Sequence, residues 1–251
     1  LELIGSKVAS PMACDFLQKW TSFPQIKKCR TQTLQKFYTT HHLRNHKKTE
    51  ARLELIRNSI PLVEDEAIVE TSILKVKSFS RQIACLNEDL DDYDHRINDL
   101  FKTHPERELF DSLPGAGPAL APRLLVAMGT NRERFAHPDE VATFSGIAPV
   151  TDRSGKHTWI HWRRACSKFL RQTFHEFANL SRRQSPWANA YYEMQRDRGK
   201  SHHAAIRALA FKWIRIIYRC WKQGKIYDEA KYLTSLAKRH SPLVKFMAQA
   251  A

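Results

Sequence analysis

The sequence predicts a mainly α-helical protein, in which long coiled-coil-like helices precede a compact helical domain. The first observation is a run of apolar residues, at alternating spacings of three and four, from Val76 to Leu100. Apolar residues also gather on one helical face in two later segments, residues 169–180 and 206–220. The third observation is the scarcity of extended pieces, which are expected only in residues 1–8 and around residues 159–162.

The first sixty residues contain fewer clear signals. Residues 1–8 fit either a strand or the end of a helix, Pro11 breaks the chain, and residues 12–20 are expected to be helical. Residues 31–60 are also expected to be helical, until Pro61 interrupts them. The basic residues of this stretch gather on one side: Lys36, Arg44, Lys47, Lys48 and Arg52.

The apolar run of the middle region forms a heptad seam, which consists of Val76, Phe79, Ile83, Leu86, Leu90, Tyr93, Ile97 and Leu100. This spacing is that of the core positions of a coiled coil or of a long antiparallel helix pair, so a dimer and an intramolecular pair both stay open. The helix is expected to end near Thr103. An acidic cluster lies mainly off the seam, where a solvated face is favoured over a metal site: Glu88, Asp91, Asp92 and Asp94.

A glycine-rich turn at residues 113–117 separates two expected helices. Gly115 and Gly117, with small residues after them, are typical of a helix-hairpin-helix, whose backbone N–H groups bind a DNA phosphate. Such a contact reads no base sequence. A plain tight turn between helices explains the same residues equally well.

The later part of the chain is expected to be helical apart from one loop, from Pro149 to His157. A short helix that ends at Gly146 precedes this loop. The expected helices span residues 139–147, 163–185, 187–196 and 202–221.

The charge of the chain predicts a polyanionic partner. The 251 residues carry a formal net charge of +15, with a pI near 9.8. Between Asp152 and Lys225, seventeen Lys and Arg residues stand against four acidic residues, which gives this segment +13. A solvated basic surface is the simpler explanation, but contacts to phosphates explain so local an excess better. Nucleic acid is therefore the expected partner.

The cysteines and the chain start bear on the setting of the protein. Five scattered cysteines without a CxxC pair predict reduced thiols in a cytosolic protein and argue against a zinc ribbon: Cys14, Cys29, Cys85, Cys166 and Cys220. No apolar run approaches the ~20 residues of a membrane-spanning helix. Because the chain begins with Leu1 and not with Met, it is expected to be the interior of a longer protein.

Ser154 is the candidate nucleophile, because a small hydroxyl on a glycine loop between two cations suits attack on a phosphodiester. Gly155 lets the backbone approach a bulky substrate, and Arg153 and Lys156 can neutralise charge on a phosphoryl group. Taken alone, these four residues also fit an ordinary solvated turn. Further phosphate contacts are expected from basic residues that follow: Arg163, Arg164, Lys168 and Arg171.

Other side chains near this loop have competing interpretations. Ser145 is expected at a helix end and Ser167 within a helix, so neither is preferred as a nucleophile. His157 and His161 flank the serine closely enough to assist proton transfer, although packing or DNA contact is favoured. The aromatic residues of this region fit stacking on unpaired bases or, more commonly, a core: Trp159, Trp162, Tyr191 and Tyr192.

Two histidine pairs also have two interpretations each. His42 and His46 have the spacing of two metal ligands on a helix, but no third ligand is nearby, so a phosphate-facing or solvated role is favoured. His202 and His203 open a helix and are interpreted as a nucleic-acid-facing edge. No metal site is therefore predicted.

The ordered motifs between residues 108 and 225 resemble the C-terminal domain of the "one-ten" family of insertion-sequence transposases, also called DEDD transposases or bridge-RNA-guided recombinases. The resemblance rests on Leu113-Pro-Gly-Ala-Gly117, Phe144-Ser-Gly-Ile-Ala-Pro149, Arg153-Ser-Gly-Lys156 and the basic helices after them. It implies an RNase H-like domain whose four acidic residues bind Mg²⁺, a helical connector, and a C-terminal domain with a DNA-attacking serine. By motif position that serine is Ser154.

The resemblance also implies DNA and a structured guide RNA as partners, a homo-oligomer, and a place in the bacterial or archaeal cytoplasm near the nucleoid. It divides the chain into the tail of a truncated RNase H-like domain (1–30), a coiled-coil connector (31–107), the transposase domain (108–235) and a tail (236–251). The front departs from the family pattern, because Ala9 and Ala13 stand where aspartates are expected and only Asp15 remains. The Mg²⁺ ligands are thus not expected in this chain.

Two functions follow from these observations. The first is a DNA transposase or recombinase that cleaves and rejoins strands through Ser154, with this chain as a fragment, a decayed copy or one piece of a split reading frame. The second is a catalytically inactive helical module that binds nucleic acid and whose serine is structural. A purely structural scaffold is a weaker third hypothesis, because it leaves the +13 segment without a partner.

Overall fold

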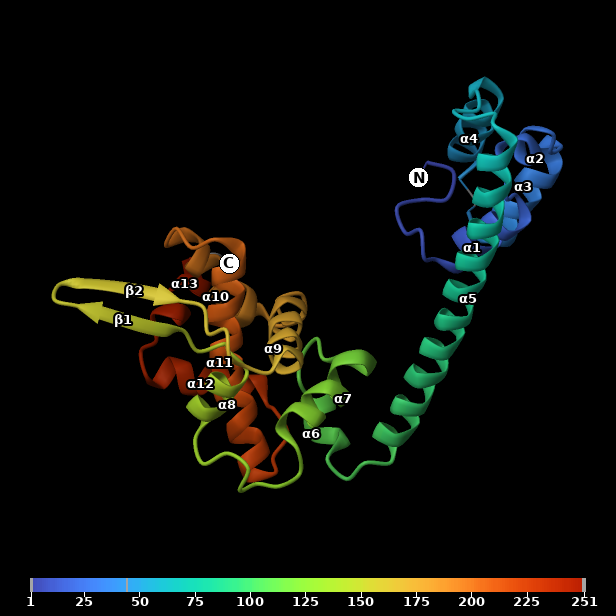
Figure 1. Ribbon diagram of the computed structural model, residues 1–251. Coiled ribbons are helices and arrows are strands. Elements are labelled where there is room, and N and C mark those ends of the chain that lie inside the picture. The colour runs from blue at the N-terminus through green and yellow to red at the C-terminus, as the bar shows by residue number, and fades with distance from the viewer. Residues whose placement is uncertain (1, 44, 250–251) are drawn as a thin grey trace. The chain divides into compact units, whose positions relative to one another are not determined.

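The computed structural model describes residues 2–43 and 45–249, except for the side chains of residues 46 and 249. Arg44 and the side chain of His46, both singled out above, lie outside this description. The chain divides into two compact units, Leu1–Tyr93 and Asp94–Ala251 (Figure 1).

The first unit is helical. It contains α1 (Pro11–Lys19), α2 (Phe23–Lys27), α3 (Thr31–Thr40), α4 (His46–Asn58) and most of α5 (Glu66–Lys102). The helix expected at residues 12–20 is confirmed as α1, whose first turn is capped by the Ser10 hydroxyl. The stretch 31–60 is two helices and not one, because the chain turns at His42, which has a φ of 60°.

A small aromatic core holds α1 to α4 together. It is formed by Phe16, Trp20, Ile26, Leu34, Phe37, Tyr38, Leu53 and Ile56. The Tyr38 hydroxyl donates to the backbone oxygen of Leu3 (3.1 Å), and burial raises the pKa of Tyr38 to about 12. Residues on both sides of position 30 share this core, so α1 and α2 pack with the segment assigned to the connector. The assignments of residues 1–30 to an RNase H-like domain and of residues 31–107 to a coiled-coil connector stay predictions.

The long helix α5 carries the heptad seam, and its end at Lys102 agrees with the expected end near Thr103. Most seam side chains are exposed in the described chain. Leu86 and Leu90 are each 59% exposed and Tyr93 is 68% exposed. The acidic residues expected off the seam are exposed as well.

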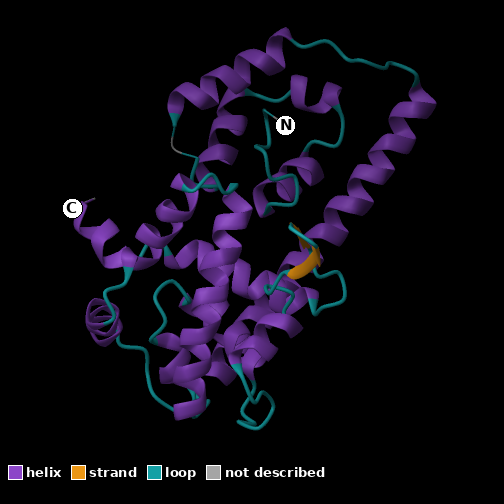
Figure 2. Ribbon diagram, turned by 90° about the vertical axis from the view of Figure 1, so that its left-hand side faces the viewer, coloured by secondary structure: helices purple, strands orange, loops and turns teal. Residues whose placement is uncertain are grey.

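The second unit is built around one long central helix, α11 (His202–Gln223), which packs against α8, α9 and α10. The helices of this unit are α6 (Arg107–Asp111), α7 (Gly117–Met128), α8 (Pro138–Phe144), α9 (Lys168–Ser181), α10 (Pro186–Asp197), α11, α12 (Glu229–Lys238) and α13 (Pro242–Gln249). The expected helices are confirmed except over residues 163–167, which precede α9, and Figure 2 shows how little of the described chain is extended.

Three tryptophans anchor this core, and each indole N–H has an acceptor. Trp213 donates to the Ser181 hydroxyl (2.8 Å), Trp187 to the Tyr227 hydroxyl (2.8 Å), and Trp221 to the Gly129 carbonyl (2.6 Å). All three side chains are fully buried. Because each N–H is satisfied, burial of these rings does not leave a polar group without a partner.

One antiparallel hairpin completes the second unit, with strands β1 (Val150–Ser154) and β2 (His157–His161). The prediction of a loop from Pro149 to His157 is therefore wrong, because β1 occupies most of it. The extended piece expected near residue 159 is confirmed as β2. The hairpin extends away from the helices of its unit (Figure 1). The mainly α fold is confirmed, and in the described residues β1 and β2 are the strands.

Candidate nucleic-acid interface

Ser154 lies at the tip of the hairpin, as the last residue of β1. Gly155 and Lys156 form the two-residue turn to β2, and Gly155 has a φ of +57°. Glycine with positive φ at the first turn position is typical of a type II′ hairpin turn. Nothing lies within 4 Å of a Cβ built on Gly155, so the tip is open to a bulky ligand.

The register of the hairpin places its side chains on two faces. Ser154 pairs with His157 and Asp152 pairs with Trp159, so these four residues share one face. Arg153 is on the opposite face, paired with Thr158. Every residue from Thr151 to His161 is exposed. The hairpin therefore offers a hydroxyl, an imidazole and an indole to solvent on one surface.

Polar contacts along this face are few. The ring of His157 stacks on that of Trp159, with centroids 5.8 Å apart. His161 Nε2 lies 3.8 Å from Asp152 Oδ2, and both side chains are exposed. Within the described residues no hydrogen bond to the Ser154 hydroxyl is found. His157 and His161 thus lie on the same face of the hairpin as Ser154, which they were expected to flank.

The remaining candidate phosphate residues lie at the base of the hairpin. Arg163 and Arg164 follow β2, Lys168 opens α9, and Arg171 lies one turn further on. Arg171 donates to the Arg163 carbonyl and to the Cys166 sulfur. The structure thus forms two basic groups, one at the tip (Arg153, Lys156) and one at the base.

Gly146 holds the base in place. A Cβ built there would lie 2.6 Å from the Cys166 sulfur and 2.7 Å from an Arg171 nitrogen. The Ser145–Gly146 motif is therefore a packing site. Ser145 is fully buried and donates to the Ala142 carbonyl (3.2 Å), which agrees with its expected place at a helix end. Ser167 is the N-cap of α9, just outside the helix in which it was expected.

The glycine turn before α7 has two different glycines. Gly115 (φ +83°) packs so closely on α9 that an added Cβ would lie 2.9 Å from the Leu180 carbonyl carbon, and its N–H donates to Gln184 (2.8 Å). A phosphate contact through this N–H requires that bond to break. Gly117 opens α7 without a side-chain cap, and a Cβ there would meet nothing within 4 Å.

The aromatic candidates divide between surface and interior. Trp159 is 50% and Trp162 is 52% exposed, whereas Tyr192 is buried and Tyr191 is half-buried. The centroid of the Trp162 ring lies close to two guanidinium groups, those of Arg171 (5.2 Å) and Arg207 (4.5 Å). The sequence motifs did not single out Arg207, because only the packing of α11 brings it to this place.

The described chain contains no group of three His, Cys, Asp or Glu residues that could hold a metal ion. Ala13 is buried, and Asp15 is exposed on α1 with its carboxylate 3.5 Å from His41. The residues present therefore do not fit the Mg²⁺ site that the resemblance implies. All five cysteines are free, and no helix among the described residues is long and apolar enough to cross a membrane.

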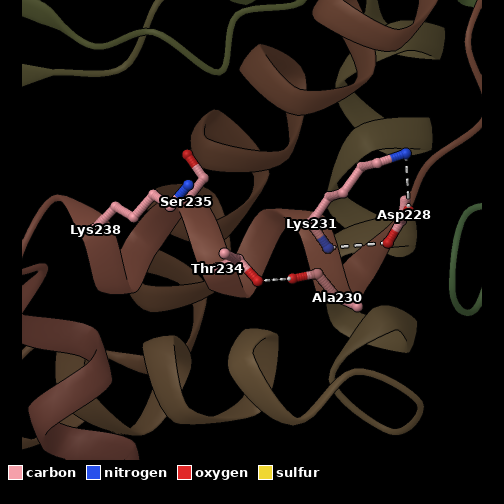
Figure 3. A pocket seen from close by; sticks show the side chains of 6 residues that line it. All are labelled: Asp228, Ala230, Lys231, Thr234, Ser235 and Lys238. Atoms are coloured by element: carbon pink, nitrogen blue, oxygen red, sulfur yellow. Dashed lines mark hydrogen bonds and ion pairs between the residues drawn. The ribbon is translucent and has the colours of Figure 1, made fainter.

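A shallow depression of about 440 Å³ lies on α12 (Figure 3). Two of its polar side chains have local partners: Asp228, the N-cap of α12, accepts from the Lys231 backbone (2.9 Å), and Thr234 donates to the Ala230 carbonyl (2.8 Å). None of the candidate site residues lines it.

The region that holds the hairpin and its base also matches a known family. Residues 107–193 match the sequence model of the "Transposase IS116/IS110/IS902 family". Residues 107–193 are therefore similar to the transposase domain of this family. The match includes α6 to α9 and most of α10, with Ser154 at its centre. This is the family that the sequence motifs indicated.

Curated relatives agree with the transposase domain. The chain is 30% identical over 146 residues to the "Mini-circle putative transposase for IS117" of Streptomyces coelicolor, covering 58% of this chain and 35% of the relative. It is 29% identical to the "Insertion element IS900 uncharacterized 42 kDa protein" of Mycobacterium paratuberculosis (62% and 39%). It is 28% identical to the "Insertion element IS110 uncharacterized 43.6 kDa protein" of S. coelicolor (70% and 47%). The matches span less than half of each relative.

Proposed function

We propose that this chain acts in the transposition of an insertion sequence, with Ser154 as the nucleophile that cleaves and rejoins DNA. The observation that carries the proposal is the position of Ser154. It lies on an exposed hairpin tip inside the matched transposase domain, between Arg153 and Lys156. The major groove of DNA admits a two-stranded ribbon, so a hydroxyl at the tip of one can approach a phosphodiester.

The proposed step is a phosphoryl transfer. The Ser154 oxygen bonds to phosphorus as the bond from phosphorus to a deoxyribose oxygen breaks, and the leaving oxygen takes a proton. A DNA hydroxyl then attacks the phosphoserine and releases the enzyme. His157 lies directly opposite Ser154, where Cβ atoms are about 5 Å apart. We propose that His157 accepts the serine proton and that Lys156, in the turn, stabilises charge on the phosphoryl oxygens, while Arg153, on the opposite face, contacts a neighbouring phosphate.

Binding to DNA, and to a structured guide RNA, is proposed from the distribution of charge. The segment from Asp152 to Lys225 carries +13. Its tip group supplies Arg153 and Lys156. The base group supplies Arg163, Arg164, Lys168 and Arg171. The open N-terminus of α7 at Gly117 adds backbone donors for a phosphate.

The metal chemistry that the resemblance implies must come from residues other than those described here, because these contain no cluster of metal ligands. The basic tip and base groups also fit a second function, a nucleic-acid-binding module without catalysis. The two functions differ in one outcome, the dependence of a covalent DNA adduct on Ser154.

A second copy of the chain is the proposed occupant of the α5 seam. Leu86, Leu90 and Tyr93 repeat at coiled-coil spacing and stay exposed in the described chain. Leu90→Glu is expected to reduce the mass measured by light scattering to that of one chain, with helix content unchanged by circular dichroism. An exposed acidic neighbour changed to another polar residue, Asp92→Asn, is the matched control.

The decisive experiment is a phosphoserine trap. The chain is mixed with an N-terminal acidic domain, Mg²⁺, guide RNA and DNA that contains the element end, and a denaturation-resistant protein–DNA adduct is measured. We expect an adduct with the wild-type chain and none with Ser154→Ala. His157→Gln is expected to slow its formation about 10²-fold or more.

Thr158→Ala is the matched control, because Thr158 is on the opposite face of the same ribbon. It should keep the adduct. An adduct that persists in Ser154→Ala would exclude this serine as the nucleophile. Salt-sensitive DNA binding without any adduct would favour the binding-only module.

A further inference from the structure

A continuous group of cationic and titratable side chains begins at the base of the hairpin and runs across α9, α10 and α11. We call it the Arg–His cluster. Its members are Trp162, Arg171, His175, Arg182, Tyr192, His202, His203 and Arg207. The tip and base motifs do not include most of these residues.

The cluster is connected from end to end by ring and charge contacts. Trp162, directly after β2, lies against Arg171 and Arg207. The ring of His175 is 6.1 Å from that of His203, which is 5.2 Å from that of His202. Arg171, His175 and Arg182 lie four and seven residues apart on α9 and its C-cap, so they follow one side of that helix over about 16 Å, and this gives the group an elongated row of charges.

The far end of the row is held by α10. The Tyr192 hydroxyl is 2.8 Å from His202 Nδ1, and the Arg182 guanidinium lies 3.8 Å from the centroid of the Tyr192 ring. His202 and His203 are both exposed and lie in the first turn of α11, where the helix dipole adds a positive field.

No carboxylate forms an ion pair with this cluster in the described residues, although the charges of Glu176 and His175 interact. Among residues 2–43 and 45–249, none of the arginines or histidines of the cluster forms an ion pair. The acid beside His175 is Glu176, but it is already paired with Arg123 (2.5 Å) and accepts from Gln172 (2.7 Å). The other charged neighbours are Arg163 and Arg196.

Several nitrogens of the cluster are buried without a hydrogen-bond partner in the described chain. They are Nε of Arg171 and Arg182 and Nε2 of His175, together with Nε of the neighbouring Arg163. Buried polar groups in native proteins are nearly always paired, with protein, water or a ligand. These nitrogens leave hydrogen-bonding capacity within the cluster, which a water molecule or a bound anion can satisfy.

The electrostatics agree with this interpretation. Burial lowers the pKa of His175, and the charges of its cluster neighbours lower it further. Burial and the charge of Arg171 lower the pKa of Arg207. Like charges thus disfavour each other's protonated forms, and a bound anion would reverse this effect.

We propose that the Arg–His cluster binds the phosphodiester backbone of nucleic acid, and that binding there takes up protons on its histidines. A row of charges suits a polymer of phosphates better than a single ion. The row starts at Trp162, so a strand bound at the hairpin can continue onto it. The inference rests on the proposed function, in that it needs nucleic acid as the ligand.

The test measures how binding depends on salt at two pH values. Each phosphate contact adds about −0.9 to the slope of log K against log [salt] for duplex DNA, and about −0.7 for a single strand. We expect the wild-type slope to be steeper by about one to two contacts at pH 5.5 than at pH 8.0. His175→Gln with His203→Gln should remove most of this difference.

Two control variants make the result specific. His240→Asn removes an exposed histidine outside the cluster, at a position with positive φ that Asn tolerates. It should keep the full pH difference. Arg207→Gln should weaken binding at both pH values more than Arg219→Gln, which removes an exposed cation about 18 Å further along α11.

Duplex DNA and single-stranded RNA of equal length serve as the two probes. A pH difference that the histidine variants remove, with either probe, supports the proposal and identifies the source of the phosphates. A difference that the histidine variants leave equal to that of His240→Asn overturns it, as does failure of the chain to bind either probe.

Failure of this proposal and failure of the serine chemistry give different results. If the Ser154-dependent adduct never forms but pH-linked binding persists, the catalytic function fails and the cluster stands. If the adduct forms and the histidine variants leave the pH difference unchanged, the cluster proposal fails alone. A histidine NMR titration checks the same point, because DNA should raise the titration midpoint of His175 in the folded chain.

Discussion

The core around α11 and the β hairpin belong to one unit but have opposite physical characters. In the core, Trp187, Trp213 and Trp221 are fully buried and each indole N–H is paired. In the hairpin, every side chain from Thr151 to His161 is exposed. The difference indicates that stability lies in the helices and that the ribbon is free to contact a ligand.

The largest expected effect comes from a tryptophan in each region. Trp213→Ala should lower the free energy of unfolding by about 3–5 kcal/mol, because it leaves a cavity at the centre of the core. Trp159→Ala on the hairpin should change it by less than about 0.5 kcal/mol. Urea denaturation measures both. Equal losses from the two variants would contradict the division between core and ribbon.

Trp159→Ala should instead weaken the binding of nucleic acid. If Trp159 stacks on a base, its loss should weaken binding to single-stranded nucleic acid by about 1–3 kcal/mol. Fluorescence anisotropy at fixed salt measures this effect. Thr158→Ala, on the other face, is the control and should bind as the wild type does.

A smaller effect is expected from two glycines with positive φ. Gly115→Ala combines a strained backbone with a contact of 2.9 Å to the backbone of α9, so a loss of at least about 2–3 kcal/mol is expected. Gly155→Ala meets open space, so only the strain of about 1–2 kcal/mol remains. Thermal unfolding compares the variants, and a larger loss at Gly155 would show that the hairpin contributes more to stability than its exposure indicates.

The smallest expected effect is a dependence of stability on pH. The pKa of His175 is lowered in the folded chain, first by burial and then by nearby positive charges. The unfolded state therefore binds more protons below a histidine's ordinary pKa of about 6.5, and stability falls as the pH drops through this range. His175→Gln should flatten the dependence. An unchanged pH profile would show that burial of His175 costs little.

The helices were predictable from local patterns, and their breaks were less so. The seam from Val76 to Leu100 predicted α5, and proline and glycine positions predicted several helix ends. The break near His42 was missed, because it depends on one positive φ value that no local pattern indicates. The sequence predicts a loop over most of the hairpin, because Val150 is the single apolar residue of β1. The two-residue turn between β-forming residues was the available signal.

The candidate site was predictable only where its residues are neighbours in sequence. Arg153, Ser154, Gly155 and Lys156 could be named together, and they lie together at the tip. The Arg–His cluster could not, because Trp162 and Arg207 meet only through the packing of α9 and α11. Side chains that come from three helices leave no spacing that a sequence pattern can detect.

The hairpin also makes the direction of the Ser154 side chain depend on the number of residues in β1. Successive residues of a strand alternate between faces, so Ser154 faces the same way as Asp152 only because they are two positions apart. One inserted residue in β1 would turn the hydroxyl to the far side of the ribbon, whereas two would return it, further out. Loops tolerate length changes of any size, but this ribbon can grow or shrink only by twos if its serine is to keep facing the same partner.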